Sequence, residues 1–351
     1  MQEVSSVGGS AAPNRDRWGM STSKLLRYYS VADRVVCFQG EDEADLDLVH
    51  SFLGGYYFTP TDGACKEPDH LIEIRKAAPP TLPHGEPGFE IEDGYCFPRN
   101  QELLLLVNGS TILVSAPQFK RTDIWLCEAT SGLHPLALNN VILYAVQAAL
   151  RRAGMYQFHA GCVLPGDRTK SIMLVGDSGC GKSTLTATLV SNGWGFVSDD
   201  NLLLRETKTG IVAWALRRYF TFDERTLAAC KLLQFPSAVG TKVPGDRNKI
   251  RFHARDAFPD GFVESCSPGT ILFPSVTSEP KSRIEPIKQA DALTRLIRQC
   301  PWATCDIAAA AGHLQVLSRL ISQTRSYSIA AGLDVFEDPT SVADLITAID
   351  A

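Results

Sequence analysis

The sequence has no excess of basic residues, because 34 Lys and Arg stand against 39 Asp and Glu and the formal net charge is -5. No stretch concentrates positive charge, so we expect no nucleic-acid partner. No apolar run approaches the ~18 residues that a membrane-spanning helix needs. Residues 1–20 lack the continuous apolar segment of a secretory signal peptide. We therefore expect a cytoplasmic protein without a membrane partner, which opens with a flexible tail over residues 1–20.

The cysteines lack the spacing of a metal site or a redox motif. There are ten of them, and no two form a C-x-x-C pair. Cys300 and Cys305 lie closest together, but no second pair completes a zinc site. We expect buried, reduced thiols. Cys180 is different, because it lies in a glycine-rich loop where a lowered pKa would make it oxidisable.

That loop is the clearest motif in the chain. The segment Gly176–Ser183 reads GDSGCGKS and fits G-x-x-x-x-G-K-[ST] at every fixed position. An apolar run, Ser171–Val175, precedes it and a helical pattern follows from Lys182 to Asn192, which is the context that the motif requires. The alternative is an ordinary glycine-rich turn. We expect backbone N–H groups to bind the phosphates of ATP, Lys182 to reach the β- and γ-phosphates, and Ser183 to bind Mg²⁺. The expected nucleotide-binding residues are Gly176, Asp177, Ser178, Gly179, Cys180, Gly181, Lys182, Ser183 and Thr184.

Two adjacent carboxylates, Asp199 and Asp200, end an apolar segment soon after the loop. P-loop enzymes place a Mg²⁺-linked acid at such a strand end. One carboxylate suffices for that, so the second indicates a base for the attacking hydroxyl or water. Successive strand residues face opposite sides, so both reach one site only if the strand ends there. The alternative is a solvated turn or a helix cap.

A histidine and three basic residues are further candidates. His159 lies among apolar residues on a strand expected over 155–164, where a histidine is more often structural. Arg217, Lys249 and Arg251 follow the carboxylates. They would place positive charge on the transferred phosphoryl group and bind the substrate, and the alternative is that they are ordinary surface residues.

The chain divides into two parts. Residues 21–135 combine one helix with many short strands, and Asn108-Gly109 is a strong hairpin signal. This part predicts a small α+β domain without a catalytic motif, a candidate for substrate recruitment. Residues 136–351 mix helices and strands and predict an α/β nucleotide-binding domain. The expected helices are 41–53, 136–152, 182–192, 223–233, 290–299, 312–323 and 341–348, and the expected strands are 70–75, 89–91, 95–97, 103–107, 111–115, 123–127, 155–164, 171–175, 195–197, 211–216, 249–253, 270–273 and 327–330.

Three motifs, FHAGCVL, GDSGCGKST and FVSDD, resemble in order and spacing the catalytic domain of the HPr kinase/phosphorylase family. The wider kinase relatives of that family include the tailoring kinases of lasso-peptide gene clusters. ILFPSV and YSIAAGLDVFEDP further along resemble the C-terminal part of the family. The resemblance covers residues 136–351. It implies a P-loop kinase domain of the HPr kinase/PEP carboxykinase type, preceded here by the small α+β domain.

The resemblance also implies roles for single residues. His159, Lys182, Asp199 and Asp200 would be catalytic. One aspartate would act as the base and the other would bind the metal beside Ser183, and we take Asp199 as the base and Asp200 as the metal ligand. ATP and Mg²⁺ would be the cofactors. Directly after the Lys and Ser of the glycine loop, the family typically carries Glu, whereas this chain has Thr184. DRNKIRF is only a loose analogue of the phosphorolysis loop of the family. These two departures favour a kinase for a hydroxyl other than that of HPr, and the reverse reaction stays open.

The leading hypothesis is an ATP-dependent kinase that transfers the γ-phosphoryl group to a hydroxyl of a Ser in a peptide or small protein. One alternative is a kinase of a small polyol or sugar. The other is a non-catalytic ATP-binding regulatory subunit. A homo-oligomer is compatible with the sequence.

Overall fold

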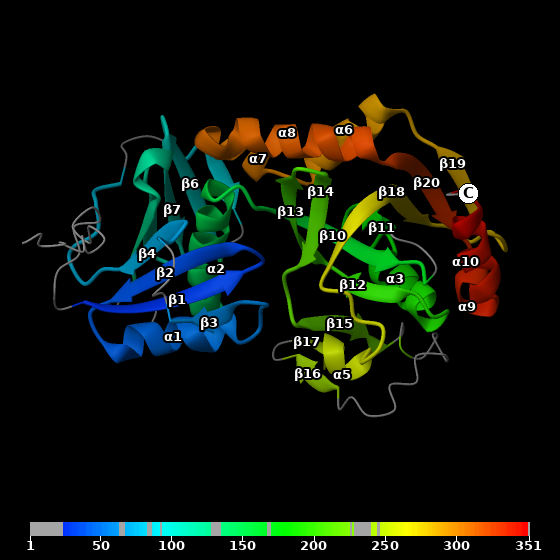
Figure 1. The fold of residues 1–351 in the computed structure, drawn as a ribbon, viewed down its shortest axis with the longest axis horizontal. Helices are drawn as coiled ribbons and strands as arrows, with labels where there is room; N and C mark the ends of the chain where they lie inside the picture. Colours follow the sequence, from blue (N-terminus) through cyan, green and yellow to red (C-terminus); the bar gives the residue numbers. More distant parts are fainter. Residues whose placement is uncertain are drawn as a thin grey trace, which may run out of the picture.

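The computed structural model describes residues 24–62, 67–82, 86–91, 93–127, 135–166, 170–224, 227, 240–243 and 246–349. The strands form three sheets that are flanked by helices, so the expected mixed α/β architecture is confirmed (Figure 1). The expected tail over residues 1–20 lies outside the described residues. Among the helices of the described part, none has the length and apolar character to span a membrane.

The first sheet contains nine strands in the order β3-β1-β2-β4-β9-β8-β7-β6-β5. Its elements are β1 (Leu25–Val31), β2 (Arg34–Gly40), α1 (Glu43–Leu53), β3 (Thr59–Thr61), β4 (His70–Ile74), β5 (Phe89–Ile91), β6 (Gly94–Arg99), β7 (Glu102–Val107), β8 (Ser110–Val114), a 3₁₀ turn (Pro117–Phe119) and β9 (Arg121–Trp125).

The hairpin expected at Asn108-Gly109 joins β7 to β8, and both turn residues have positive φ, 48° and 79°. The hairpin of β1 and β2 was not expected. Its turn places Ala32 at φ 54°, a position that usually takes glycine or asparagine, so the sequence carries no turn signal there.

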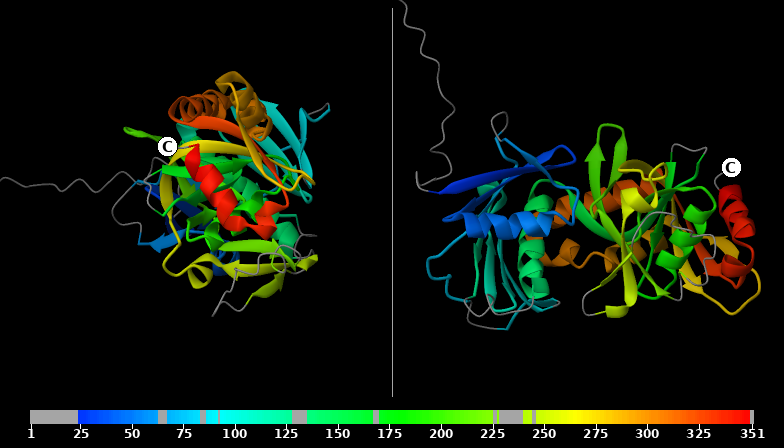
Figure 2. Two further views of the ribbon diagram at one scale, coloured as in Figure 1. Left: turned by 90° about the vertical axis from the view of Figure 1, so that its right-hand side faces the viewer. Right: turned by 90° about the horizontal axis from the view of Figure 1, so that it is seen from below.

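Helix α2 (Pro135–Arg152) lies between the first sheet and the second (Figures 1 and 2). It packs against β4, β8 and β9 on one side and against β10 on the other. Leu203 and Leu216 from the C-terminal part belong to the same hydrophobic core as the first sheet and α2. One continuous core therefore joins the two parts of the chain.

The second sheet contains eight strands, in the order β11-β10-β13-β14-β18-β20-β19, with β12 also paired to β10. Strand β11 pairs with β18 as well, so five of the strands close into a ring. The strands are β10 (Tyr156–Leu164), β11 (Lys170–Val175), β12 (Gly195–Ser198), β13 (Asn201–Thr207), β14 (Gly210–Ala215), β18 (Ser265–Val276), β19 (Arg283–Pro286) and β20 (Arg325–Ala331).

The remaining elements surround this sheet. The third sheet, ordered β15-β17-β16, is formed by β15 (Tyr219–Asp223), β16 (Thr241–Val243) and β17 (Asp246–His253). The helices are α3 (Lys182–Ser191), α5 (Ala254–Ala257), α6 (Gln289–Arg298), α7 (Trp302–Cys305), α8 (Ile307–Gln323), α9 (Asp334–Glu337) and α10 (Pro339–Ala348).

Two expected helices differ from the structure. The helix expected over 223–233 falls mostly outside the described residues, and Asp223 ends strand β15 instead. The helix expected over 312–323 begins earlier, at Ile307. Gly312 suggested the start of the helix, but it lies inside α8. A Cβ at this position would come within 2.2 Å of the Tyr156 hydroxyl. The glycine therefore allows close packing and does not end the helix.

Candidate active site

Strand β10 brings the glycine loop and the carboxylate pair to one edge of the second sheet. Ala160 pairs with Val175, the last residue of β11, and Gly176 opens the loop directly after it. On its other side, the Ala160 N–H donates to the carbonyl oxygen of Asp200 at 2.9 Å. The loop and the carboxylate pair thus lie on opposite sides of Ala160. The strand that leads into the loop and the backbone of the pair are about two strand spacings apart, or roughly 10 Å.

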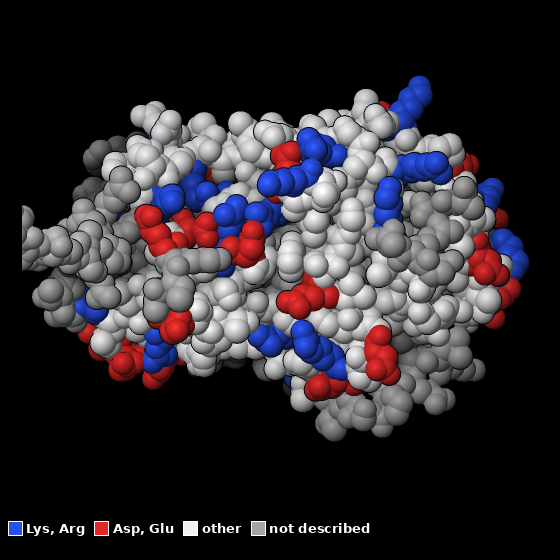
Figure 3. Space-filling model, in the orientation of Figure 1, with Lys and Arg blue, Asp and Glu red and all other residues white. Residues whose placement is uncertain are grey.

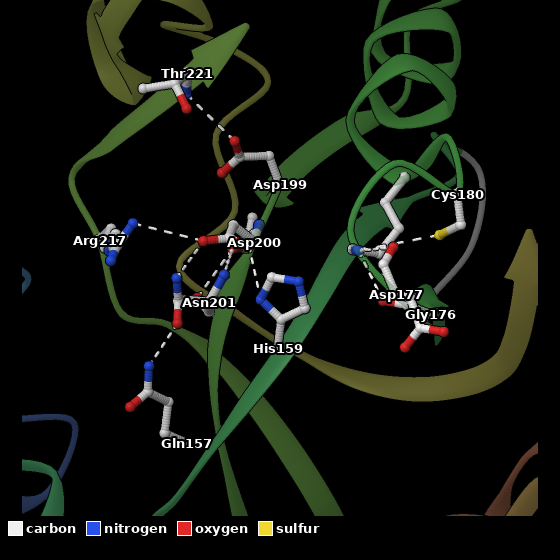
Figure 4. Close-up of polar contacts among 12 residues, drawn as sticks. Gln157, His159, Gly176, Asp177, Cys180, Asp199, Asp200, Asn201, Arg217 and Thr221 are labelled. Carbon is white, nitrogen blue, oxygen red and sulfur yellow. Dashed lines mark hydrogen bonds and ion pairs between the residues drawn. The ribbon is translucent and has the colours of Figure 1, made fainter. Parts of the chain in front are cut away.

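The loop has the backbone shape that the motif requires. Gly179 and Gly181 have φ of 81° and 99°, values that favour glycine. Gly181 caps α3, which begins at Lys182. The Lys182 side chain is buried, and its Nζ donates to the carbonyl oxygens of Gly176 at 2.8 Å and Asp177 at 3.0 Å (Figure 4). The ammonium group is therefore held within the loop itself.

Gly161, which the sequence analysis did not identify as a site residue, lies at the closest approach of α3 to β10. A Cβ built on Gly161 would lie 2.8 Å from the Thr186 hydroxyl on α3 and 3.4 Å from the carbonyl oxygen of Asp199. A Cβ at this position would therefore require the Thr186 side chain or α3 to move away from β10.

The carboxylate pair lies in a turn between two strands. Strand β12 ends at Ser198 and β13 begins at Asn201, and both pair with β10. The Ser198 hydroxyl accepts from the N–H groups of Asp200 at 3.2 Å and Asn201 at 3.0 Å, and donates to the Asn201 carbonyl at 2.9 Å. The strand therefore breaks at the pair, which is the condition under which both carboxylates can serve one site.

Asp199 is buried, with 6% of its surface exposed. Its carboxylate accepts from the Thr221 N–H of β15 at 3.3 Å (Figure 4). Burial, and next the negative charge of Asp200, raise the pKa of Asp199 to about 7. The carboxyl of Asp199 therefore gains or loses its proton close to neutral pH.

Asp200 is held by several partners. Its Oδ1 lies 2.8 Å from His159 Nδ1, and its Oδ2 lies 3.5 Å from the Arg217 guanidinium and accepts from the Asn201 side chain (Figure 4). Burial acts to raise its pKa. The hydrogen bond and charge of His159, and then the charges of Arg217 and Lys182, outweigh burial and lower the pKa of Asp200 below its usual value. Asp200 is therefore an anion at neutral pH.

The structure thus places His159, Lys182, Asp200 and Arg217 in one neighbourhood, with Asp199 next to them in the chain. In the close-up, His159 lies between Asp200 and the glycine loop (Figure 4). This histidine is 41% exposed and bonded to a carboxylate, so it is not the buried structural histidine of the alternative interpretation.

Among the basic residues, Arg217 contacts Asp200, whereas Lys249 and Arg251 lie on β17 in the third sheet. The Arg251 guanidinium lies over the ring of Tyr219, 5.8 Å from its centroid. Lys249 pairs through the backbone with Asp223.

Three polar residues of the site were not found from the sequence. Asn201 donates to Asp200 and accepts from Gln157, which lies two residues before His159 on β10. Thr221 contributes only a backbone N–H, which cannot be predicted from a pattern of side chains. The period of two along β10 would have placed Gln157 on the same face as His159.

The carboxylates do not form a self-sufficient metal site. Within the described residues, no three His, Cys, Asp or Glu side chains come together in a metal-binding group. A Mg²⁺ ion bound by two protein oxygens and the phosphates of a nucleotide needs no such group. All eight cysteines in the described part are free and most of them are buried, as expected.

Comparisons with known proteins give similarities to solved structures alone. No family model matches the chain, and no curated protein matches it. Among solved structures, the chain is similar to the HPr(Ser) kinase/phosphatase from Coxiella burnetii. The two share 13% sequence identity with a TM-score of 0.27, and the match covers 55% of this chain and 95% of the other. A similarity this distant supports no statement on activity.

Proposed function

We propose that this protein is an ATP-dependent kinase that transfers the γ-phosphoryl group to a hydroxyl of a Ser in a peptide or small protein. The observation that carries the proposal is the common position of the Gly176–Ser183 loop and the Asp199–Asp200 turn on either side of Ala160. P-loop phosphotransferases combine a phosphate-binding loop with an acidic residue for Mg²⁺ and a residue that orients or deprotonates the attacking group.

The loop would bind the triphosphate. Residues from Gly176 to Thr184 would surround the β-phosphate with backbone N–H groups at the N-terminus of α3. The ammonium group of Lys182 now lies on two loop carbonyls, at 2.8 and 3.0 Å, and would exchange them for oxygens of the β- and γ-phosphates.

The carboxylates would divide the chemistry between them. Asp199, with a pKa of about 7, would accept the proton of the attacking hydroxyl. As that proton leaves, the oxygen bonds to the γ-phosphorus, the bond to the β-phosphate oxygen breaks, and ADP leaves with the bonding pair. His159, held by Asp200, and Arg217 would stabilise the charge on the transferred group.

The donor set fits Mg²⁺. Asp200 is an anionic carboxylate and Ser183 is the second residue of α3, so an acidic and a hydroxyl oxygen would hold the ion beside the phosphates. When bound, Mg²⁺ supplies neutralisation of the phosphate charge.

The residues that would bind the acceptor lie outside the glycine loop. The third sheet borders Asp199 through Thr221 and carries Lys249 and Arg251, so we assign substrate contacts to these two residues and Arg217.

The first sheet is assigned a role in recruiting the acceptor. On the face drawn in Figure 3, Lys and Arg side chains lie among Asp and Glu side chains. Such a mixed surface suits a protein or peptide better than a polyanion.

The test is a transfer assay with [γ-³²P]ATP and Mg²⁺. One arm contains a degenerate library of Ser-containing peptides, and the other contains glycerol, sorbitol and hexoses. We expect label on peptides, and its loss in Lys182→Ala. Label on a polyol or sugar would replace the acceptor class. ATP binding with no transfer in either arm would favour a non-catalytic regulatory subunit.

A further inference from the structure

A short segment of the N-terminal part forms backbone hydrogen bonds next to the site. Gly55–Phe58 follows α1 and runs antiparallel to Leu216–Arg218, with a bridge between Tyr56 and Arg217. The Tyr57 N–H donates to the Leu216 carbonyl at 3.0 Å, and the Arg218 N–H donates to the Gly55 carbonyl at 3.1 Å. The two parts of the chain thus share a two-stranded contact that includes a residue of the site.

The side chain of Arg218 fastens this contact. Its Nε donates to the Tyr56 carbonyl, and its Nη2 donates to the Phe58 carbonyl at 3.2 Å. Its guanidinium also lies over the Tyr57 ring, 5.1 Å from the centroid. A guanidinium presents several donors in one rigid plane, so it can bind two carbonyls and an aromatic face at once. Arg218 therefore binds the N-terminal segment along its whole length.

Residues next to Arg218 in the chain supply partners to both carboxylates. Arg217 lies 3.5 Å from Asp200, and the Thr221 N–H donates to Asp199 at 3.3 Å. Just before them, the Leu216 N–H donates to the Asn201 carbonyl at 3.4 Å. Leu216 is also buried in the core of the N-terminal part. The positions of Arg217 and Thr221 therefore depend on where the chain from Leu216 to Thr221 is held.

We propose that Arg218 is a positioning residue of the active site, through which Gly55–Phe58 of the N-terminal part fixes Arg217 and Thr221 against the carboxylate pair. The N-terminal part then belongs to the catalytic unit, and a ligand that displaces Gly55–Phe58 would disturb the positions of Arg217 and Thr221. The catalytic consequence rests on the proposed kinase function, whereas the structural coupling does not.

Hydrogen–deuterium exchange of the full-length protein tests the coupling without any ligand. In Arg218→Ala, we expect the amides of Tyr57 and Thr221 to exchange about 10-fold faster or more, as for the loss of a hydrogen bond to a charged group. Peptides from α8 and α10, remote from the contact, should keep their wild-type exchange. Arg255→Ala is the matched control. Its guanidinium also lies near the Tyr57 ring, at 6.0 Å, and interacts with the Tyr57 side chain, whereas Arg218 donates to the backbone carbonyls of Tyr56 and Phe58.

Steady-state hydrolysis of Mg·ATP, with water as acceptor, tests the consequence. Arg218→Ala should lower kcat about 10- to 100-fold, because a small misplacement of catalytic groups has effects of this size. KM for ATP should change less than about 2-fold, since the loop is untouched, and Arg218→Lys should fall between because it retains one donor group.

Several results would overturn the positioning role. One is unchanged exchange at Thr221 in Arg218→Ala, and another is equal exchange in the Arg218→Ala and Arg255→Ala proteins. Faster exchange with an unchanged kcat would also overturn it. A wild-type protein that does not bind Mg·ATP would contradict the proposed kinase function, while the exchange experiment would still decide the coupling. Global faster exchange in Arg218→Ala would indicate unfolding, and Arg218→Lys would then decide.

Discussion

Replacing Asp199 with Asn should stabilise the protein at neutral and alkaline pH. The pKa of the buried carboxyl is raised from 3.8 to about 7, a difference of roughly 3 units or about 4 kcal/mol. A raised carboxyl pKa means that the folded state favours the neutral acid. Its contribution to stability is therefore complete below pH 3.8 and is lost progressively as the pH rises through about 7. Asn stays neutral at every pH, and its Oδ can still accept from Thr221.

The advantage of Asp199→Asn over the wild type should therefore grow with pH and level off above about 7. Between pH 5 and pH 8 the difference in unfolding free energy should increase by about 3 kcal/mol. Urea unfolding at the two pH values measures it, with a chelator present so that no metal binds the pair. Asp260→Asn, at an exposed position, is the control and should show no such trend.

The same substitution should damage transfer while it improves stability. Loss of a general base typically lowers the rate by ~10² to 10⁴-fold. In the wild type, kcat should rise with pH through about 7 as Asp199 ionises, and this limb should be absent in Asp199→Asn. An equal difference in stability at pH 5 and pH 8 would refute the reasoning about burial. A variant that is more stable and fully active would refute the assignment of the base.

Three further substitutions have distinct expected results. Lys182→Ala should abolish transfer and leave the fold intact, because it removes the cation of the loop; near-normal turnover would show that the loop is not catalytic. Asp200→Asn should weaken Mg²⁺-dependent ATP binding, and added Mg²⁺ should restore part of it, whereas Mg²⁺-independent affinity should not change; calorimetry measures both. Gly161→Ala should destabilise the fold by about 1 to 3 kcal/mol in urea unfolding, because its Cβ would lie 2.8 Å from the Thr186 hydroxyl, and a neutral effect would show that α3 can move away.

The core of the site could be predicted from the sequence, because its signals are local. The glycine loop, its flanking strand and helix, and the adjacent carboxylates are short motifs with a defined backbone requirement, and each lies where it was expected. The hairpin at Asn108 was predictable for the same reason, since its turn residues suit a positive φ.

The rest depends on contacts between residues far apart in the chain. Arg218 binds carbonyl groups of Tyr56 and Phe58, and a backbone acceptor leaves no trace in the sequence. Thr221 contributes an N–H, which any residue other than proline could supply. Helix α2 packs on both sheets, and an apolar helix does not reveal in advance which of two neighbours it will cover.

Calorimetric titration with ATP, in the presence and absence of Mg²⁺, tests most directly the claim on which the proposed function depends, that the Gly176–Ser183 loop and the Asp199–Asp200 pair form one ATP site. The wild type should bind ATP with a single site per chain and more tightly with Mg²⁺, because Ser183 and Asp200 hold the ion beside the phosphates. Lys182→Ala should bind much more weakly under the same conditions. Absence of binding at millimolar ATP, or equal binding by the wild type and Lys182→Ala, would contradict the proposal that the Gly176–Ser183 loop and the Asp199–Asp200 pair form an ATP site.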